Sequence, residues 1–270
     1  MKTIYSSILL LLILINCATA TPPPDPIPVH ETIKIESKIL GETRVINIWT
    51  PSIYQKNNEP LPVLYMPYGG EKEDFPRIAN TLAELIAAKK IPPTILVGIE
   101  NTQRRKDLTG PTEVASDKEI GPIVGGSENF RNFIKTELIP AINQQYRTTA
   151  EKGIIGESLA GLFVTETFLT EPNLFHYYIA FDPSIWWNDH KLEKTAKEHL
   201  AKFPTTEKRF WFAGSDALDI YTHTRNLATD FKTANLPNLK WIYSEEPKEK
   251  HNTIFRATKE KAMIWTMNKN

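Results

Sequence analysis

The sequence predicts an α/β protein with a mostly parallel central sheet and helices on both of its faces. Near the N-terminus, residues 32–37 and 44–49 alternate polar and apolar side chains, which is the period of half-buried antiparallel strands. From residue 61 onwards, continuous apolar runs alternate with segments that have helical spacing. Strands buried on both faces read as continuous apolar runs, so this alternation predicts parallel strands joined by helices.

The elements follow one another at short intervals along the chain. A turn at Gly41-Glu42 joins the two alternating segments into an antiparallel hairpin. The apolar runs predict strands at 61–66, 94–99, 153–157, 177–181, 209–213 and 239–243. The spacing of apolar residues predicts helices at 78–89, 129–144, 162–169, 191–202, 224–234 and about 253–267. Residues 110–128 are rich in Gly, Pro, Ser and charge, and we expect a long loop of the functional or disordered kind there.

Composition limits the classes of function. The chain has 270 residues, 41% of them hydrophobic, which is enough for one large core, and we expect one domain over residues 30–270. Lys and Arg number 32 and balance 32 Asp and Glu, which argues against a nucleic-acid binder or a polybasic membrane-surface protein. No segment after the first twenty residues has the length and apolarity that a membrane-spanning helix requires.

The first twenty residues have the pattern of a signal peptide. Lys2 gives a minimal positive start, residues 8–15 form an apolar stretch too short to span a bilayer, and Ala18-Thr19-Ala20 has the form of a cleavage site. We therefore expect export to the periplasm or the medium. Residues 21–29 form a Pro-rich linker.

Cys17 is the one cysteine of the chain and lies inside this leader. Cleavage after Ala20 would leave a mature chain without a disulfide, and a metal site built on cysteines is excluded. An alternative is that residues 14–17 resemble a bacterial lipobox, in which case Cys17 would be a lipidated N-terminus. Asn16 stands where that signal has a small residue.

The segment from Gly156 to Gly161, with the sequence GESLAG, is the strongest signal of chemistry. An apolar run precedes it and a helix-like run follows it, which is the strand–sharp turn–helix context that makes a serine a nucleophile in α/β-hydrolases. Ser158 is the predicted nucleophile. Leu159 would begin the helix, so its N–H is free to point at an oxyanion. The alternative is that Ser158 only caps the helix.

A serine nucleophile needs a base and a group that orients the base, and in α/β-hydrolases they follow in the order acid, then histidine. His251 lies in a polar loop after the strand 239–243 and before the last helix, and is the predicted base; His223, at the start of a helix, is second. Asp216, after the strand 209–213, is the favoured acid, with Asp219 next and Asp182 at the end of the preceding strand. Each could instead be a helix cap or a turn residue. A Ser–His pair without a strong third member would still be able to work.

The loop after the first buried strand predicts a second oxyanion donor. Gly69 and Gly70 follow this strand, and glycines allow the backbone to approach a substrate closely. A simple tight turn is the alternative. Trp186 and Trp187, near the carboxyl edge of the sheet, could line an acyl or alcohol pocket, with core packing as the alternative.

Several segments are similar to one known family. The stretches 95–109, 125–147, 154–162 and 175–187, which include ILVGIENT, IIGESLAGL and DPSIWW, resemble the "Putative esterase" family. This branch of the α/β-hydrolases includes siderophore esterases and S-formylglutathione hydrolases. The resemblance extends over about residues 30–265. It implies the α/β-hydrolase fold, no cofactor, and hydrolysis of a small-molecule ester through an acyl-enzyme, with Ser158 as nucleophile and His251 as base.

Two departures from the family concern the substrate more than the chemistry. Glu157 stands where the family often has His, and residues 250–253 lack the His-Gly or His-Ser step of many members. Two alternatives therefore stay beside a general serine esterase. One is an esterase for catecholate siderophores, and the other is a non-catalytic binding module on a hydrolase scaffold.

Overall fold

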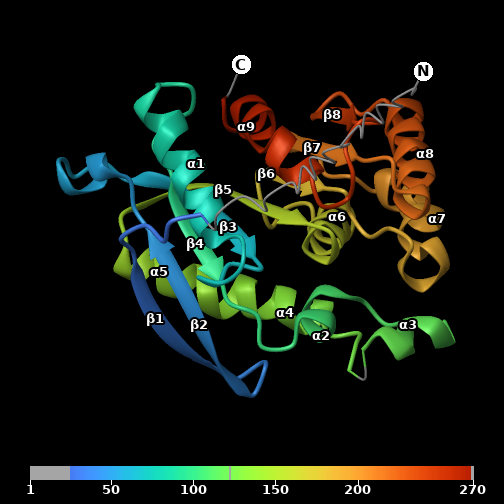
Figure 1. Cartoon of the computed structure of the whole chain (residues 1–270), viewed down its shortest axis with the longest axis horizontal. Helices are drawn as coiled ribbons and strands as arrows, with labels where there is room; N and C mark the ends of the chain where they lie inside the picture. Colours follow the sequence, from blue (N-terminus) through green and yellow to red (C-terminus); the bar gives the residue numbers. More distant parts are fainter. Residues whose placement is uncertain (1–24, 122, 269–270) are drawn as a thin grey trace, which may run out of the picture.

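A computed structural model of the chain describes residues 25–121 and 123–268. These residues contain one eight-stranded sheet in the order β1-β2-β4-β3-β5-β6-β7-β8. β1 and β2 form an antiparallel hairpin, β2 is antiparallel to β4, and the remaining neighbours are parallel (Figure 1). The predicted α/β fold with its N-terminal hairpin is thus confirmed. The predicted leader, its cleavage site and Cys17 lie outside the described residues and stay predictions.

The bounds of the elements agree with the sequence pattern to within a few residues in most places. The strands are β1 (Glu31–Ser37), β2 (Glu42–Trp49), β3 (Leu61–Pro67), β4 (Ile95–Ile99), β5 (Thr148–Glu157), β6 (Tyr177–Phe181), β7 (Lys208–Gly214) and β8 (Leu239–Glu245). The α-helices are α1 (Phe75–Ala87), α2 (Arg104–Leu108), α3 (Ala115–Ile120), α4 (Ser127–Phe133), α5 (Ile139–Gln145), α6 (Leu159–Thr170), α7 (Trp187–Leu200), α8 (Leu218–Ala234) and α9 (Ile254–Met267).

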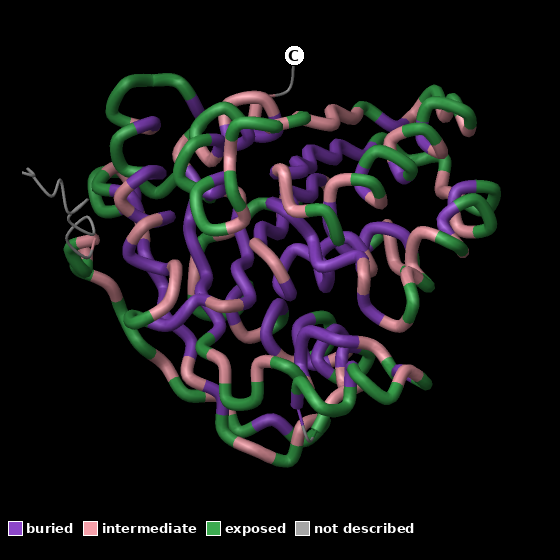
Figure 2. Tube along the Cα trace, turned by 45° about the vertical axis from the view of Figure 1, so that its right-hand side comes forward, coloured by how far each residue is buried: buried purple, intermediate pink, exposed green. Residues whose placement is uncertain are grey.

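The side chains of each parallel strand alternate between two cores, one on each face of the sheet. On β6, Tyr177, Ile179 and Phe181 pack into the core beneath α1 and α9, whereas Tyr178 and Ala180 pack into the core beneath α4, α6, α7 and α8. Buried segments accordingly fill the middle of the molecule (Figure 2). This arrangement explains why the strands read as continuous apolar runs.

Helix α6 carries the predicted nucleophile at its start and is buried almost all round. Only Glu166 and Thr170 within it are not buried. The helix packs directly against β5 and β6. A helix that is apolar on every side belongs to the interior of a protein, so the turn that precedes α6 is fixed by packing on both sides.

Two segments differ from the sequence prediction. The helix expected over 129–144 is divided into α4, a π-helical stretch η2 (Ile134–Leu138) and α5, since Pro140 has no N–H to continue the regular hydrogen-bond ladder. The loop expected over 110–128 contains α3. Asp117 fixes this short helix, because its carboxylate accepts hydrogen bonds from the Thr112 hydroxyl at 2.6 Å and from the Asn188 N–H at 2.8 Å.

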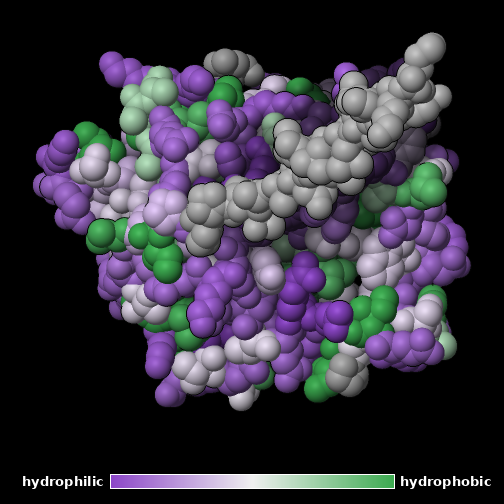
Figure 3. Space-filling model, viewed as in Figure 1, coloured by the Kyte–Doolittle hydropathy of each residue, from purple (hydrophilic) through white to green (hydrophobic). Residues whose placement is uncertain are grey.

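The surface seen in Figure 3 is mainly hydrophilic, with hydrophobic residues in small separate groups. Among residues 25–121 and 123–268, no helix combines the length and the apolarity that a membrane span would need.

Candidate active site

Three residues with positive φ lie at the carboxyl ends of neighbouring strands. Tyr68 (φ 70°) follows β3, Ser158 (φ 59°) follows β5 and Asp182 (φ 44°) follows β6. A positive φ at a residue with a side chain costs about 1–3 kcal/mol, and such residues cluster at functional sites. Ligands of open α/β sheets bind outside the carboxyl ends of the strands. The backbone alone therefore marks this edge as the candidate site.

The turn at Ser158 needs small neighbours. A Cβ on Gly156 would lie 2.6 Å from the carbonyl atoms of Ala160, and one on Gly161 would lie 2.9 Å from the carbonyl oxygen of Phe181. The Ser158 N–H donates to the same Phe181 oxygen at 3.0 Å, which fixes the turn to the end of β6. The glycine positions of the GESLAG segment thus let β5 pass directly into α6 with the serine side chain raised above the sheet.

His251 lies beside Ser158, as the sequence predicts. Its Nε2 is 3.1 Å from the Ser158 Oγ, and its Nδ1 is 2.6 Å from the Asp182 Oδ2. A carboxylate accepts, so the Nδ1–H donates to Asp182 and the Nε2 lone pair is left for the serine hydroxyl. The three side chains form a continuous chain of hydrogen bonds.

The prediction that Asp216 orients His251 is wrong for this structure. The Asp216 carboxylate pairs with the Nζ of Lys250, and its N–H donates to the Glu249 carbonyl at 3.0 Å. Asp216 therefore supports the loop that carries the histidine and does not contact the imidazole. Asp219, the second candidate, lies exposed in the first turn of α8.

Asp182 takes the position because β6 is the neighbour of β5, whereas β7, which precedes Asp216, is one strand further away. Asp182 is completely buried. The Ser215 N–H donates to its Oδ1 at 2.7 Å and the Ser215 hydroxyl to its Oδ2 at 2.8 Å, so the carboxylate is fully hydrogen-bonded. Ser215 had no signal in the sequence. Ser184 had none either, and its Oγ lies 3.4 Å from the Ser158 Oγ.

The hydrogen bond with Asp182 raises the pKa of His251, and the negative charges of Asp182 and Asp219 act in the same direction, as does Glu157 once it is ionised. Partial burial of the imidazole opposes this increase. The balance favours the imidazolium, which is the form a general base must pass through when it accepts a proton.

Glu157, next to the nucleophile, has the most strongly perturbed carboxyl group at this edge. Burial, with the charge of Asp74 as the second cause, raises its pKa to about 8. Burial likewise raises the pKa of Asp74 to about 6. Below pH 8 Glu157 is therefore mostly neutral, and it becomes a negative charge beside His251 only above that pH.

The N–H groups of the two glycines predicted to supply the second oxyanion donor already donate hydrogen bonds within the protein. The Gly69 N–H donates to the Ile99 carbonyl at 2.9 Å, and the Gly70 N–H donates to the Glu73 Oε2 at 2.7 Å. Both predictions are wrong because the loop uses these amides to hold itself against β4 and α1. Leu159 is the first residue of α6, where a backbone N–H has no partner within the helix, and Tyr68 follows the last residue of β3; neither N–H donates to a carbonyl of another described loop or turn. Leu159 matches its predicted place at the start of α6, and Tyr68 precedes the glycines that the sequence indicated.

The two tryptophans have different surroundings. Trp187 is buried, and its indole N–H donates to the Gly110 carbonyl at 2.9 Å, so it packs beneath the 110 loop. Trp187 therefore has the core-packing role that was the alternative to lining a substrate pocket. Trp186 is half-buried and lies two residues beyond Ser184. Its place in a substrate pocket stays a prediction.

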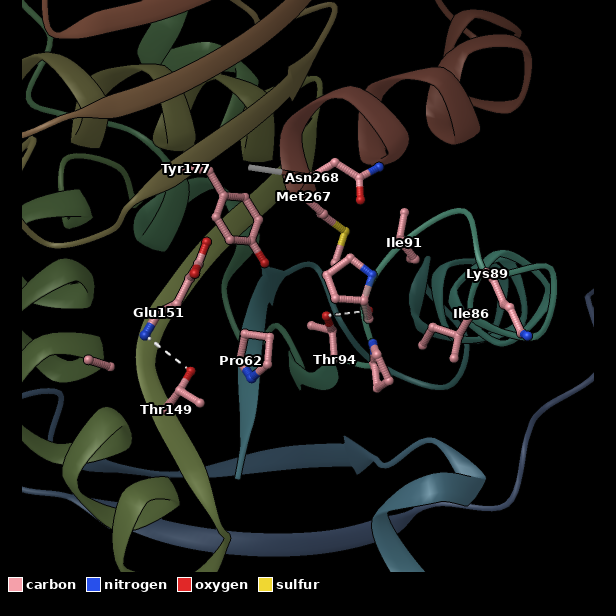
Figure 4. Close-up of a pocket in the computed structure, with 13 residues that line it drawn as sticks. Pro62, Ile86, Lys89, Ile91, Thr94, Thr149, Glu151, Tyr177, Met267 and Asn268 are labelled. Carbon is pink, nitrogen blue, oxygen red and sulfur yellow. Dashed lines mark hydrogen bonds between the residues drawn. The ribbon is translucent and has the colours of Figure 1, made fainter. Parts of the chain in front are cut away.

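A cavity of about 870 Å³ lies at the other edge of the sheet (Figure 4). Pro62, Thr94, Thr149 and Tyr177 line it, and all four stand at or beside the amino ends of strands. The cavity is thus remote from Ser158. We place the site at the carboxyl edge, where the hydrogen-bonded side chains are, rather than at this cavity.

A mostly parallel sheet with a serine on a strained turn, followed in the chain by an aspartate and a histidine that hydrogen-bond in series, has the architecture of the α/β-hydrolases. Residues 37–262 match the family described as "Putative esterase", and the chain belongs to this family.

Relatives and solved structures agree with this assignment. The chain is 38% identical over 109 residues to the ferri-bacillibactin esterase BesA of Bacillus subtilis, covering 36% of this chain and 38% of the relative. It is 36% identical over 88 residues to the siderophore triacetylfusarinine C esterase of Aspergillus fumigatus, covering 32% and 28%. These matches span about a third of the curated relatives' length. An IroE-like serine hydrolase from Shewanella oneidensis has the same fold, with a TM-score of 0.80 and 24% identity over 88% of this chain and 79% of that chain.

Proposed function

We propose that the protein is a serine esterase that cleaves carboxylic esters through an acyl-enzyme on Ser158. The observation that carries the proposal is the series of hydrogen bonds from Ser158 to His251 and from His251 to the buried Asp182. This series meets the need of a hydroxyl nucleophile for an adjacent base that a third group orients. Family membership supports the same reaction.

In the first half of the reaction, the Ser158 Oγ attacks the ester carbonyl and its proton passes to the Nε2 of His251. Asp182 stabilises the imidazolium and holds its tautomer, and it is itself held by two hydrogen bonds from Ser215. The Leu159 N–H, at the start of α6, is our candidate for one oxyanion donor, and the Tyr68 N–H is our candidate for the second.

The first tetrahedral intermediate then collapses: the bond between the acyl carbon and the alcohol oxygen breaks, the imidazolium gives its proton to that oxygen, and the acyl group stays on Ser158. In the second half, a water molecule attacks the acyl carbonyl while His251 takes its proton. Collapse of the second tetrahedral intermediate returns the proton to Ser158 Oγ and releases the carboxylic acid.

A fluorophosphonate probe tests the nucleophile. We expect stoichiometric labelling of the wild-type protein, with the modified residue identified as Ser158 by mass spectrometry. Ser158→Ala should take no label. Ser184→Ala is the matched control, since this neighbouring hydroxyl has no histidine partner, and it should still be labelled. An unlabelled wild-type protein that also cleaves no activated short-chain ester would favour a non-catalytic binding module.

The pH profile of kcat/KM should have two limbs with separate causes. Activity should rise with pH as His251 loses its proton, with a midpoint above the ordinary imidazole value of 6.5, because Asp182 raises its pKa. Above a pH of about 8, ionised Glu157 should oppose the oxyanion that forms beside it, and activity should fall. Glu157→Gln should remove the alkaline limb and keep the acidic one. An alkaline limb that persists in this variant would assign it to another group.

Siderophore esters are the second candidate substrate. The two curated relatives support them, since one is named a ferri-bacillibactin esterase and the other a siderophore triacetylfusarinine C esterase. A comparison of kcat/KM for an iron-free catecholate lactone, its ferric complex and p-nitrophenyl butyrate would decide. A preference of at least about tenfold for either form of the lactone, equivalent to about 1.4 kcal/mol of transition-state binding, would support this substrate class. Equal or better turnover of the simple ester would point to a general esterase.

A further inference from the structure

Two histidines and a glutamate meet between α7 and α8, outside the candidate active site. His190 and Glu193 belong to α7 and His223 belongs to α8. One potential ligand atom from each residue lies within 4.8 Å of the other two. All three are partly buried. Imidazole nitrogens and a carboxylate oxygen are a set that zinc and related divalent ions bind.

The backbone leaves the helical conformation at the start of α7, and this irregular turn brings His190 to the cluster. Asn188, Asp189 and His190 all have left-handed φ and ψ, which interrupts the first turn of α7. In this conformation the His190 ring stacks on the His223 ring, with 3.5 Å between the centroids and 15° between the planes. The buried Nδ1 of His190 has no hydrogen-bond partner among the described residues. An unpartnered buried nitrogen is costly, and a bound cation would satisfy it.

A neighbouring hydrogen bond holds the Glu193 carboxylate in one orientation, as is usual for carboxylates that bind metal ions. The Asn226 side-chain amide donates to the Glu193 Oε1 at 2.8 Å, which fixes the carboxylate and leaves the Oε2 directed at the Nδ1 of His223. Such an outer hydrogen bond orients a ligating carboxylate. The contact between His223 and Glu193 holds a proton in the metal-free protein, and a metal ion can replace that proton.

We propose that His190, Glu193 and His223 bind one divalent transition-metal ion of the zinc class, which links α7 to α8. Water would complete the four-coordinate shell. The in-plane lone pairs of two stacked rings cannot converge on one ion. Binding therefore requires one imidazole to turn about its Cβ–Cγ bond, a torsion with a broad minimum, and the stacking of the two rings is lost.

The bound metal ion would stabilise the protein and would not contact the reacting atoms. The chain from Asp182 leads into α7, and the chain from Ser215 leads into α8, so the ion would join the helices that follow these two residues. The interrupted turn also holds α3, through the hydrogen bond of the Asn188 N–H to Asp117. Metal binding should therefore stabilise both the α7–α8 contact and the attachment of the 110–121 segment.

The test is direct metal binding to the untagged full chain, stripped with EDTA and dialysed. Titration with ZnCl₂ in a calorimeter should give one site per chain, and Co²⁺ should give the visible absorption of a four-coordinate site. His190→Gln and His223→Gln should each weaken binding by at least about 10–100-fold. His199→Gln, a histidine further along α7 and outside the cluster, is the matched control and should bind as the wild type does. Circular dichroism checks that each variant is folded.

A milder variant keeps the test meaningful if a histidine variant does not fold. Asn226→Ala leaves all three ligands in place and should weaken Zn²⁺ binding by about tenfold through the loss of the carboxylate's hydrogen bond. The wild-type protein should also gain thermal stability with added Zn²⁺. The proposal is overturned if the stripped wild-type protein does not bind Zn²⁺ at micromolar concentrations, or if binding is unchanged in every folded variant of the cluster.

Discussion

Replacing His251 by alanine should lower kcat for an activated ester by about 10⁶, and adding Ser158→Ala should lower it no further. The two side chains act as one unit because the Ser158 hydroxyl becomes a nucleophile only when the Nε2 at 3.1 Å takes its proton. Once either is lost, the remaining rate comes from binding and from the oxyanion donors.

The measurement is a double-mutant cycle on steady-state kcat, with the two single variants and the double variant. KM should change little, because neither side chain is needed to bind the ester in its ground state. His176→Ala is a control at a histidine that contacts β5 on its amino-terminal side, 3.3 Å from the Lys152 N–H. If the losses from His251→Ala and Ser158→Ala multiply in the double variant, the two residues act independently and the proposed pair is wrong.

Asp182→Asn should lower kcat by about 10⁴, whereas Asp216→Asn should change it by less than about tenfold. The substitution replaces one carboxylate oxygen by an amide NH₂, which donates to Nδ1, so the ring proton moves to Nε2 and the imidazole can no longer accept the proton of Ser158. Asp182 is buried and Asp216 is paired with Lys250 at the surface, so the same chemical change falls on two different roles.

The pH profile of Asp182→Asn distinguishes a lost hydrogen bond to His251 from a loss of folding. The raised pKa of His251 depends first on its hydrogen bond with Asp182, so the acidic limb of kcat/KM in Asp182→Asn should move to lower pH. Thermal unfolding should show that both variants are folded at the assay temperature. A large loss in Asp216→Asn together with a small loss in Asp182→Asn would restore Asp216 as the acid.

The meeting of Ser158 and His251 could be predicted because the signals of both residues are local. Ser158 lies in a short pattern between a strand and a helix, and His251 lies in the loop after the last strand. The hairpin and the parallel strands could be predicted for a similar reason, since the period of apolar residues follows directly from which faces are buried.

The partner of His251 and the candidate for the second oxyanion donor could not be predicted because they depend on tertiary contacts. Whether Asp182 or Asp216 reaches His251 is decided by the order of strands in the sheet, which no local pattern contains. The candidate amide at Tyr68 and the occupied amides at Gly69 and Gly70 depend on where Ile99 and Glu73 lie. The α3 helix depends on Asp117 meeting the distant Asn188.

Because Asp182, at the end of β6, is the residue that contacts His251, the connection between β7 and α8 joins this series of hydrogen bonds only through Ser215, which donates to Asp182. Its next residues, Asp216 and Ala217, are partly exposed, and Leu218 is 87% exposed. Exposed connections tolerate insertion and substitution better than buried strands do. Ala217 and Leu218 are therefore positions where directed evolution can vary side chains and loop length to change substrate preference without replacing Ser158, His251, Asp182 or the residues that hold them.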